Sequence, residues 1–97
     1  KYNVLVLEDD PYSLINFTNI KYKNLYELNN GKNIIYLGTF SKYISPSINV
    51  GYILSNITLL GELYSFKESF DLDTSLFNQL VVLDYLQKRS AIQRAIF

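Results

Sequence analysis

Five side chains that can carry out acid–base chemistry or bind a polar ligand follow two short apolar segments of the sequence. They are Asp9, Tyr12, Thr39, Ser41 and Lys42. The chain contains no His and no Cys, so any acid–base chemistry has to use Lys, Asp, Glu or Tyr. These residue types therefore make a chemical site conceivable, provided that the fold brings them together.

The apolar segments that precede these residues predict two buried strands. Residues 3–9 (NVLVLED) and 33–40 (NIIYLGTF) are typical of strands covered on both faces of a parallel sheet. About twenty residues separate them, which is enough for a crossover connection between parallel strands, and residues 24–29 can form a short helical turn within it. Parallel neighbours end at the same edge, where open α/β sheets bind ligands, so we expect the five side chains at that edge.

The next segment predicts a third strand of opposite direction. Residues 41–48 form a loop that contains Pro46, and residues 49–55 (NVGYILS) are again apolar. Only about eight residues join this strand to the one before it, whereas a parallel return needs a dozen or more. We therefore expect it to run antiparallel to its neighbour.

Two helices are predicted after the strands. Ser55 or Asn56 can cap a helix that starts at Ile57, and Asp73 or Thr74 can cap a second helix that ends at Gln87 or continues to Ile96. The side chains expected to be buried are Leu59, Leu60, Leu63, Phe66 and Phe70 in the first helix and Leu76, Phe77, Leu80, Val81 and Leu83 in the second. The fold class is α/β, with three strands followed by two helices.

Composition limits the classes of function. The 97 residues carry nine basic and nine acidic side chains, which argues against nucleic-acid contact by this segment. No stretch approaches the ~18 apolar residues of a membrane span, no signal peptide is visible, and the absence of Cys fits a cytoplasmic protein. Because the chain begins with Lys1 rather than Met, we expect a piece of a larger protein.

Three motifs together carry a resemblance to a known family. LEDDPY (7–12), YLGTFSK (36–42) and SPSINVGYI (45–53) are similar to the core of the class I and II aminotransferases, the fold-type I enzymes that use pyridoxal phosphate. The branch that they resemble includes aminoadipate-type aminotransferases and MocR-type regulators of the GntR family. SLFNQLVVLDYL (75–86) also resembles a helix of this family, so the resemblance spans nearly the whole chain. It implies that residues 1–97 are part of the large, cofactor-binding domain.

The resemblance implies a role for each matching residue. Lys42 would form a Schiff base with the cofactor aldehyde, Asp9 would pair with the pyridine nitrogen, and Tyr12 would donate a hydrogen bond to the phenolic oxygen. Thr39 and Ser41 would hydrogen-bond the phosphate. Asp10 competes with Asp9 through proximity, although the Asp-x-x-Tyr spacing favours Asp9. The plainer alternative is a solvated lysine, a packed tyrosine and hydroxyls that bond to nearby backbone.

Asn49 stands where the family pattern has an arginine that grips the phosphate. An arginine makes two charge-assisted hydrogen bonds to a phosphate, whereas asparagine makes at most a weaker neutral one. Three explanations stay open: a cation from outside this segment compensates, the protein binds the cofactor weakly and regulates, or the site is vestigial.

Three functions follow as hypotheses. The intact protein would be a homodimeric aminotransferase that moves an amino group between an amino acid and a 2-oxo acid, with this piece inactive alone. Alternatively, it would be the cofactor-sensing domain of a MocR-type regulator with little or no catalysis. The third hypothesis is an α/β folding unit without activity.

Overall fold

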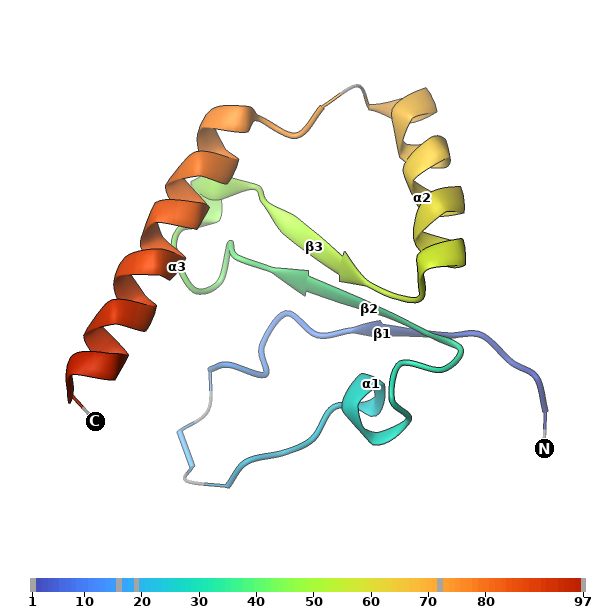
Figure 1. The fold of residues 1–97 in the computed structure, drawn as a ribbon, viewed down its shortest axis with the longest axis horizontal. Coiled ribbons are helices and arrows are strands. Elements are labelled where there is room, and N and C mark those ends of the chain that lie inside the picture. Colours follow the sequence, from blue (N-terminus) through green and yellow to red (C-terminus); the bar gives the residue numbers. More distant parts are fainter. Residues whose placement is uncertain (1, 16, 19, 72, 97) are drawn as a thin grey trace.

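The computed structural model describes residues 2–15, 17–18, 20–71 and 73–96, with side chains described as far as Ser90. The elements are β1 (Val6–Asp9), α1 (Leu25–Leu28), β2 (Ile34–Thr39), the 3-10 turn η1 (Pro46–Ile48), β3 (Gly51–Leu54), α2 (Ile57–Phe70) and α3 (Leu76–Ile96) (Figure 1). The α/β class and the order of strands and long helices are confirmed, although each strand is shorter than the apolar segment that predicts it.

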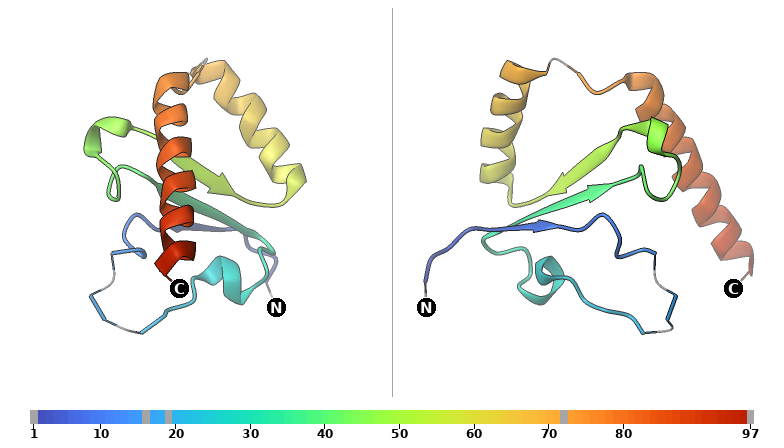
Figure 2. Two further views of the ribbon diagram at one scale, coloured as in Figure 1. Left: turned by 60° about the vertical axis from the view of Figure 1, so that its left-hand side comes forward. Right: turned by 180° about the vertical axis from the view of Figure 1, so that it is seen from behind.

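The sheet has the order β1-β2-β3, with β2 in the centre. β1 pairs with β2 in parallel, so that Asp9 stands opposite Leu37, and β3 pairs with β2 antiparallel, so that Gly51 stands opposite Thr39. Both directions are those that the connection lengths predict. β1 and β2 therefore end at the same edge of the sheet, and α3 stands beyond that edge (Figures 1 and 2).

Burial is concentrated in the central strand. Ile34, Ile35 and Tyr36 of β2 are between 4% and 8% exposed. The prediction that the first strand is buried on both faces is wrong, because Val6 is 37% and Leu7 is 63% exposed. β1 is an edge strand, paired on one side only by the described residues, so its apolar side chains stay open.

The two long helices add little to this core. Asn56 caps α2 by accepting a hydrogen bond from the Leu59 backbone N–H at 3.0 Å, as predicted, but α2 contains no buried residue. Phe66 and Phe70 contact each other with ring centroids 4.9 Å apart and remain exposed. The half-buried side chains of its predicted apolar side are Leu59, Leu60 and Leu63.

The start of α3 differs from the prediction of a cap at Asp73 or Thr74. The Ser75 hydroxyl accepts a hydrogen bond from the Asn78 backbone N–H at 3.4 Å, and the Ser75 carbonyl accepts the first helical bond, from Gln79. Ser75 therefore caps the helix. At its other end α3 reaches Ile96, the longer of the two predicted lengths.

The buried side of α3 was also predicted wrongly. The expected residues are exposed, namely Leu76, Phe77, Leu80, Val81 and Leu83. Val82 is buried instead, at 5% exposed, and it packs with Ile48 and Val50 in a small cluster that Phe40 and Ile44 extend. In the part of α3 whose side chains are described, Val82 thus packs on the loop between β2 and β3. Helical periodicity indicates which residues share a side of a helix, but not which side meets a neighbour.

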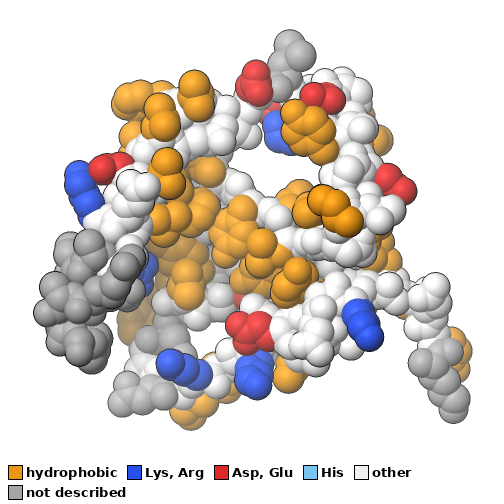
Figure 3. All heavy atoms as spheres, viewed as in Figure 1, with side chains coloured by type: hydrophobic (Ala, Val, Ile, Leu, Met, Phe, Trp, Pro, Cys, Tyr) orange, Lys and Arg blue, Asp and Glu red, His pale blue; other side chains and the backbone are white. Residues whose placement is uncertain are grey.

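Much apolar surface is left uncovered by these contacts. Figure 3 shows apolar side chains over the face of the sheet between α2 and α3. None of the helices in the described parts of the chain is both long enough and apolar enough to cross a membrane.

The glycine at position 38 allows the aromatic packing of the sheet. The Tyr52 ring of β3 lies directly over Gly38 of β2, and it contacts Phe40 and Tyr36 at centroid distances of 5.2 and 6.2 Å. A side chain at position 38 would displace that ring.

We predict that Gly38→Ala lowers the free energy of unfolding by about 1–3 kcal/mol, because the added Cβ overlaps the Tyr52 ring. Gly61→Ala is the matched control, since no atom lies within 4 Å of its added Cβ, and it should stabilise α2 by about 0.5–1 kcal/mol. Urea unfolding of both variants measures the difference. Equal effects of the two substitutions would contradict the packing described for Tyr52.

Candidate functional site

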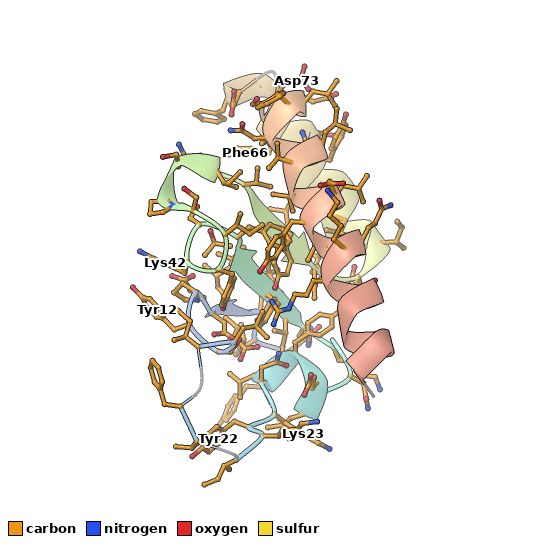
Figure 4. All side chains as sticks on the ribbon, turned by 90° about the vertical axis from the view of Figure 1, so that its left-hand side faces the viewer. Tyr12, Tyr22, Lys23, Lys42, Phe66 and Asp73 are labelled. Carbon is orange, nitrogen blue, oxygen red and sulfur yellow. The ribbon has the colours of Figure 1, made fainter. Side chains whose placement is uncertain are left out.

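Lys42 and Tyr12 lie next to each other at the edge where β1 and β2 end. Lys42 is in the turn after β2, and its Nζ lies 5.8 Å from the centroid of the Tyr12 ring, within the range of a cation–π contact (Figure 4). The turn is closed by hydrogen bonds from the Tyr43 and Ile44 backbone N–H groups to the Phe40 carbonyl. Both Lys42 and Tyr12 are exposed, so amine and phenol are open to a ligand from solvent.

Three consecutive acids at the end of β1 have different surroundings. The Glu8 carboxylate accepts two hydrogen bonds at the start of α1, from the Leu25 and Tyr26 backbone N–H groups at 2.8 and 2.9 Å. Asp9 is exposed, and among the described residues its carboxylate has no hydrogen-bond partner. Because side chains alternate along a strand, Glu8 and Asp9 leave β1 on opposite faces. Glu8 thus holds α1 to the strand, and Asp9 is free to meet a ligand.

Asp10, the competing acid in the sequence, is engaged in the fold. Its carboxylate accepts hydrogen bonds from the Tyr36 hydroxyl at 2.8 Å and the Ser13 backbone N–H at 3.0 Å. Burial raises the pKa of Asp10, but the bonds from Ser13 and Tyr36 outweigh it and hold the pKa below its ordinary value of 3.8. Burial and the bond to Asp10 raise the pKa of Tyr36. Asp10 therefore fastens the loop after β1 to the central strand.

The hydroxyl residues and Asn49 lie at the same end of the β2–β3 pair. Thr39 is the last residue of β2, and its Oγ1 accepts a hydrogen bond from the Ser41 backbone N–H at 3.2 Å. A further bond from Phe40 N to Val50 O continues the pairing past Thr39, and Asn49 directly precedes Val50 in the loop that leads into β3. These are the residues that the sequence predicts for the phosphate end of a site.

Asn49 has a backbone conformation that suits its residue type. It ends η1 in the left-handed region, at φ 49° and ψ 39°. Asparagine adopts this region more readily than other residues with a Cβ, whereas arginine has no such preference. The left-handed backbone is thus a local reason for asparagine at this position, which the sequence motifs do not reveal.

The loop that carries Lys42 and Asn49 is held by α3. The Asn78 amide donates a hydrogen bond to the Ile48 carbonyl at 2.8 Å, and Val82, one turn further on, packs against Ile48 and Val50. Sequence reasoning missed these two anchoring residues, and it missed the contact of Glu8 with α1. No local motif marks such contacts, since Asn78 and Ile48 are far apart in the chain.

An open cavity of about 800 Å³ adjoins the candidate site. Tyr12 lines it together with Lys21, Tyr22 and Lys23 of the connection to α1. Figure 4 shows Lys23 well apart from Lys42. In the part of the chain that the structure describes, no group of acidic, His or Cys side chains could hold a metal ion.

Known proteins that the chain matches are aminotransferases and a transcriptional regulator. It is 30% identical over 87 residues to aromatic-amino-acid aminotransferase 1 of Thermococcus litoralis, covering 90% of this chain and 21% of that protein. It is 33% identical over 88 residues to 2-aminoadipate transaminase of Thermus thermophilus, covering 88% of this chain and 22% of that protein. It is 29% identical over 92 residues to HTH-type transcriptional regulator NorG of Staphylococcus aureus, covering 93% of this chain and 20% of that protein.

These matches confirm the resemblance to the aminotransferase branch that also includes HTH-type regulators. The chain spans about a fifth of the length of each of these relatives. No family model matches the chain.

We predict that Asp10→Asn reduces stability at neutral pH by about 1 kcal/mol, because two hydrogen bonds to a charged acceptor become bonds to a neutral one. A lowered folded-state pKa contributes stability above the unfolded value near 3.8, and this stability is lost as the pH falls through the folded value. Urea unfolding of wild type and variant should therefore converge at low pH. Asp71→Asn, at an exposed acid after α2, is the control, and parallel pH profiles for wild type and Asp10→Asn would contradict the assignment.

Proposed function

We propose that residues 1–97 are part of the large domain of a pyridoxal-phosphate-binding, aminotransferase-like protein. The whole protein would move an amino group between an amino acid and a 2-oxo acid and would act as a homodimer. The observation that carries the proposal is the pairing of Lys42 with Tyr12 at the sheet edge where Asp9 ends the neighbouring strand. The match to aminotransferases over about nine tenths of the chain supports it.

The donor set at this edge fits pyridoxal phosphate. Its aldehyde needs a primary amine, its ring nitrogen a carboxylate, and its phenolic oxygen a hydrogen-bond donor, and Lys42, Asp9 and Tyr12 supply these groups. Of the three acids at this strand end, Asp9 is the one whose carboxylate is available, because the carboxylates of Glu8 and Asp10 accept hydrogen bonds from other described residues. The phosphate needs hydrogen-bond donors, which Thr39 and Ser41 can provide.

Each residue then has a distinct task. Lys42 would hold the cofactor through its Nζ and, as a free amine, would take and return the proton at the substrate Cα. Asp9 would keep the ring nitrogen protonated, and Tyr12 would orient the ring. When bound, the cofactor supplies an electron sink that makes the substrate Cα proton acidic.

Asn49 sets the expected strength of phosphate binding. A hydrogen bond to a charged group contributes about 1.5–3 kcal/mol and a neutral one about 1 kcal/mol, so the absence of arginine weakens binding roughly tenfold. Weak binding suits a protein that responds to the cofactor concentration as well as it suits a poor catalyst.

The second candidate function is a cofactor-sensing domain of an HTH-type regulator, which the match to NorG favours. The two functions differ in turnover. An aminotransferase converts added amino acids to 2-oxo acids with the cofactor bound, and a regulator binds the cofactor without that conversion.

The open apolar surface supports the proposal that this segment is only a part of its domain. Phe66, Phe70 and Phe77 are between 65% and 78% exposed, and such surface is usually covered by further chain or by a partner. On this proposal, residues 1–97 alone do not transaminate.

The cofactor assignment predicts a single modified lysine. When the full-length protein is mixed with pyridoxal phosphate, reduced with borohydride and mapped by mass spectrometry, the adduct should lie on Lys42. Lys42→Ala should abolish it, whereas Lys23→Ala, which removes an exposed lysine of the neighbouring cavity, should not. Labelling spread evenly over the lysines would refute the site.

If Asn49 faces the phosphate, an arginine at this position should raise the affinity for pyridoxal phosphate. Asn49→Arg should tighten binding of pyridoxal phosphate by about tenfold, because a charge-assisted contact is restored. Asn30→Arg is the control, since Asn30 has the same φ of 49° and lies away from the site, before β2. Affinities come from titration of the cofactor absorbance. If both variants bind like the wild type, Asn49 does not face the phosphate.

A further inference from the structure

The Tyr43 hydroxyl connects the two loops that form the candidate site. It donates a hydrogen bond to the Pro11 carbonyl at 3.2 Å and accepts one from the Leu14 backbone N–H at 3.3 Å. One phenol can do both, because its oxygen is donor and acceptor at once. Pro11 and Leu14 flank Tyr12 and Ser13, so this single group holds both sides of the turn that carries Tyr12.

The turn after β1 depends on this contact at its tip. Its base is fastened to the central strand by the Asp10 backbone N–H, which donates to the Leu37 carbonyl at 3.0 Å, and by the Asp10–Tyr36 bond. Beyond Pro11 the described part of the turn has two local bonds, from Ser13 N to the Asp10 carboxylate at 3.0 Å and from Ile15 N to Tyr12 O at 2.8 Å. Tyr12 itself is 60% exposed, so packing does little to fix its ring.

The Tyr43 contact also sets the position of the amine. Tyr43 directly follows Lys42 in a turn that the Phe40 carbonyl closes, and its side chain is half-buried. The backbone that carries Lys42 is therefore fixed to the backbone that carries Tyr12. The Lys42 amine lies 5.8 Å from the centroid of the Tyr12 ring across this link.

We propose that Tyr43 is a positioning residue, whose hydroxyl holds Tyr12 beside Lys42 so that both meet the same ligand. This inference rests on the proposed function. It adds a residue that the motifs do not mark, and it assigns no contact with the cofactor to Tyr43.

Tyr43→Phe tests the inference, because it removes both hydrogen bonds and keeps the ring that packs in the fold. Without cofactor, the Leu14 amide of the full-length variant should exchange its hydrogen about fivefold faster, as expected for one lost hydrogen bond. Tyr22→Phe is the control, since Tyr22 lines the neighbouring cavity and is 74% exposed. Unchanged exchange at Leu14 would overturn the proposal.

With pyridoxal phosphate, the readout is the pH profile of the adduct that borohydride traps on Lys42. Tyr43→Phe should shift this profile in the same direction as Tyr12→Phe, and the double variant should match Tyr12→Phe alone, because Tyr43 acts through Tyr12. A general loss of stability would not produce this non-additivity. Additive shifts, or a Tyr43→Phe profile equal to that of the wild type, would overturn the positioning role.

The outcomes separate the two proposals. If the wild-type protein forms no adduct on Lys42, the proposed function fails and the role of Tyr43 fails with it. If the adduct forms and only the Tyr43→Phe results disagree, the proposed function stands and the positioning role is wrong.

Discussion

The two-sided pairing of β2 is the constraint on which the rest of the structure depends. The strand is hydrogen-bonded to β1 in parallel and to β3 antiparallel, and its first half is the most buried part of the sheet. This pairing brings three distant segments to one edge: the loop after Asp9, the turn with Lys42 and the left-handed residue Asn49. If β1 or β3 shifted by one residue relative to β2, the side chains of the shifted strand would point to the opposite face of the sheet.

Around this strand, three adjacent acids have separate tasks. Glu8 accepts hydrogen bonds from the start of α1, Asp10 binds the Tyr36 hydroxyl, and the Asp9 carboxylate has no hydrogen-bond partner among the described residues. Two carboxylates thus stabilise the connection between β1 and β2, and the third is available to a ligand. On the other side of the site, Asn78 holds the loop that ends at Asn49. The candidate site consists of exposed and half-buried groups at two strand ends and in the segments that follow them, and the hydrogen bonds of Asp10 and Asn78 hold these segments in place.

The sequence was sufficient to predict the strands, their directions and the residues at their shared edge, because apolar runs and connection lengths constrain a sheet strongly. It was not sufficient for the helices. Their periodicity was correct, yet Val82 rather than the predicted side of α3 is buried, since α3 packs on a loop. The openness of β1 was missed because burial depends on which elements cover a strand. The hydrogen bonds of Glu8 and Tyr43 join residues that are far apart in the chain, and no local sequence pattern predicts them.

The central claim is that one cofactor is held between the two neighbouring strand ends. A crystal structure of the full-length protein with pyridoxal phosphate tests it most directly. We expect continuous density from the Lys42 Nζ to the cofactor, with the Asp9 carboxylate at the pyridine nitrogen and the Tyr12 hydroxyl at the phenolic oxygen. Cofactor attached to a different lysine, or an Asp9 side chain directed away from the ring, would contradict the account.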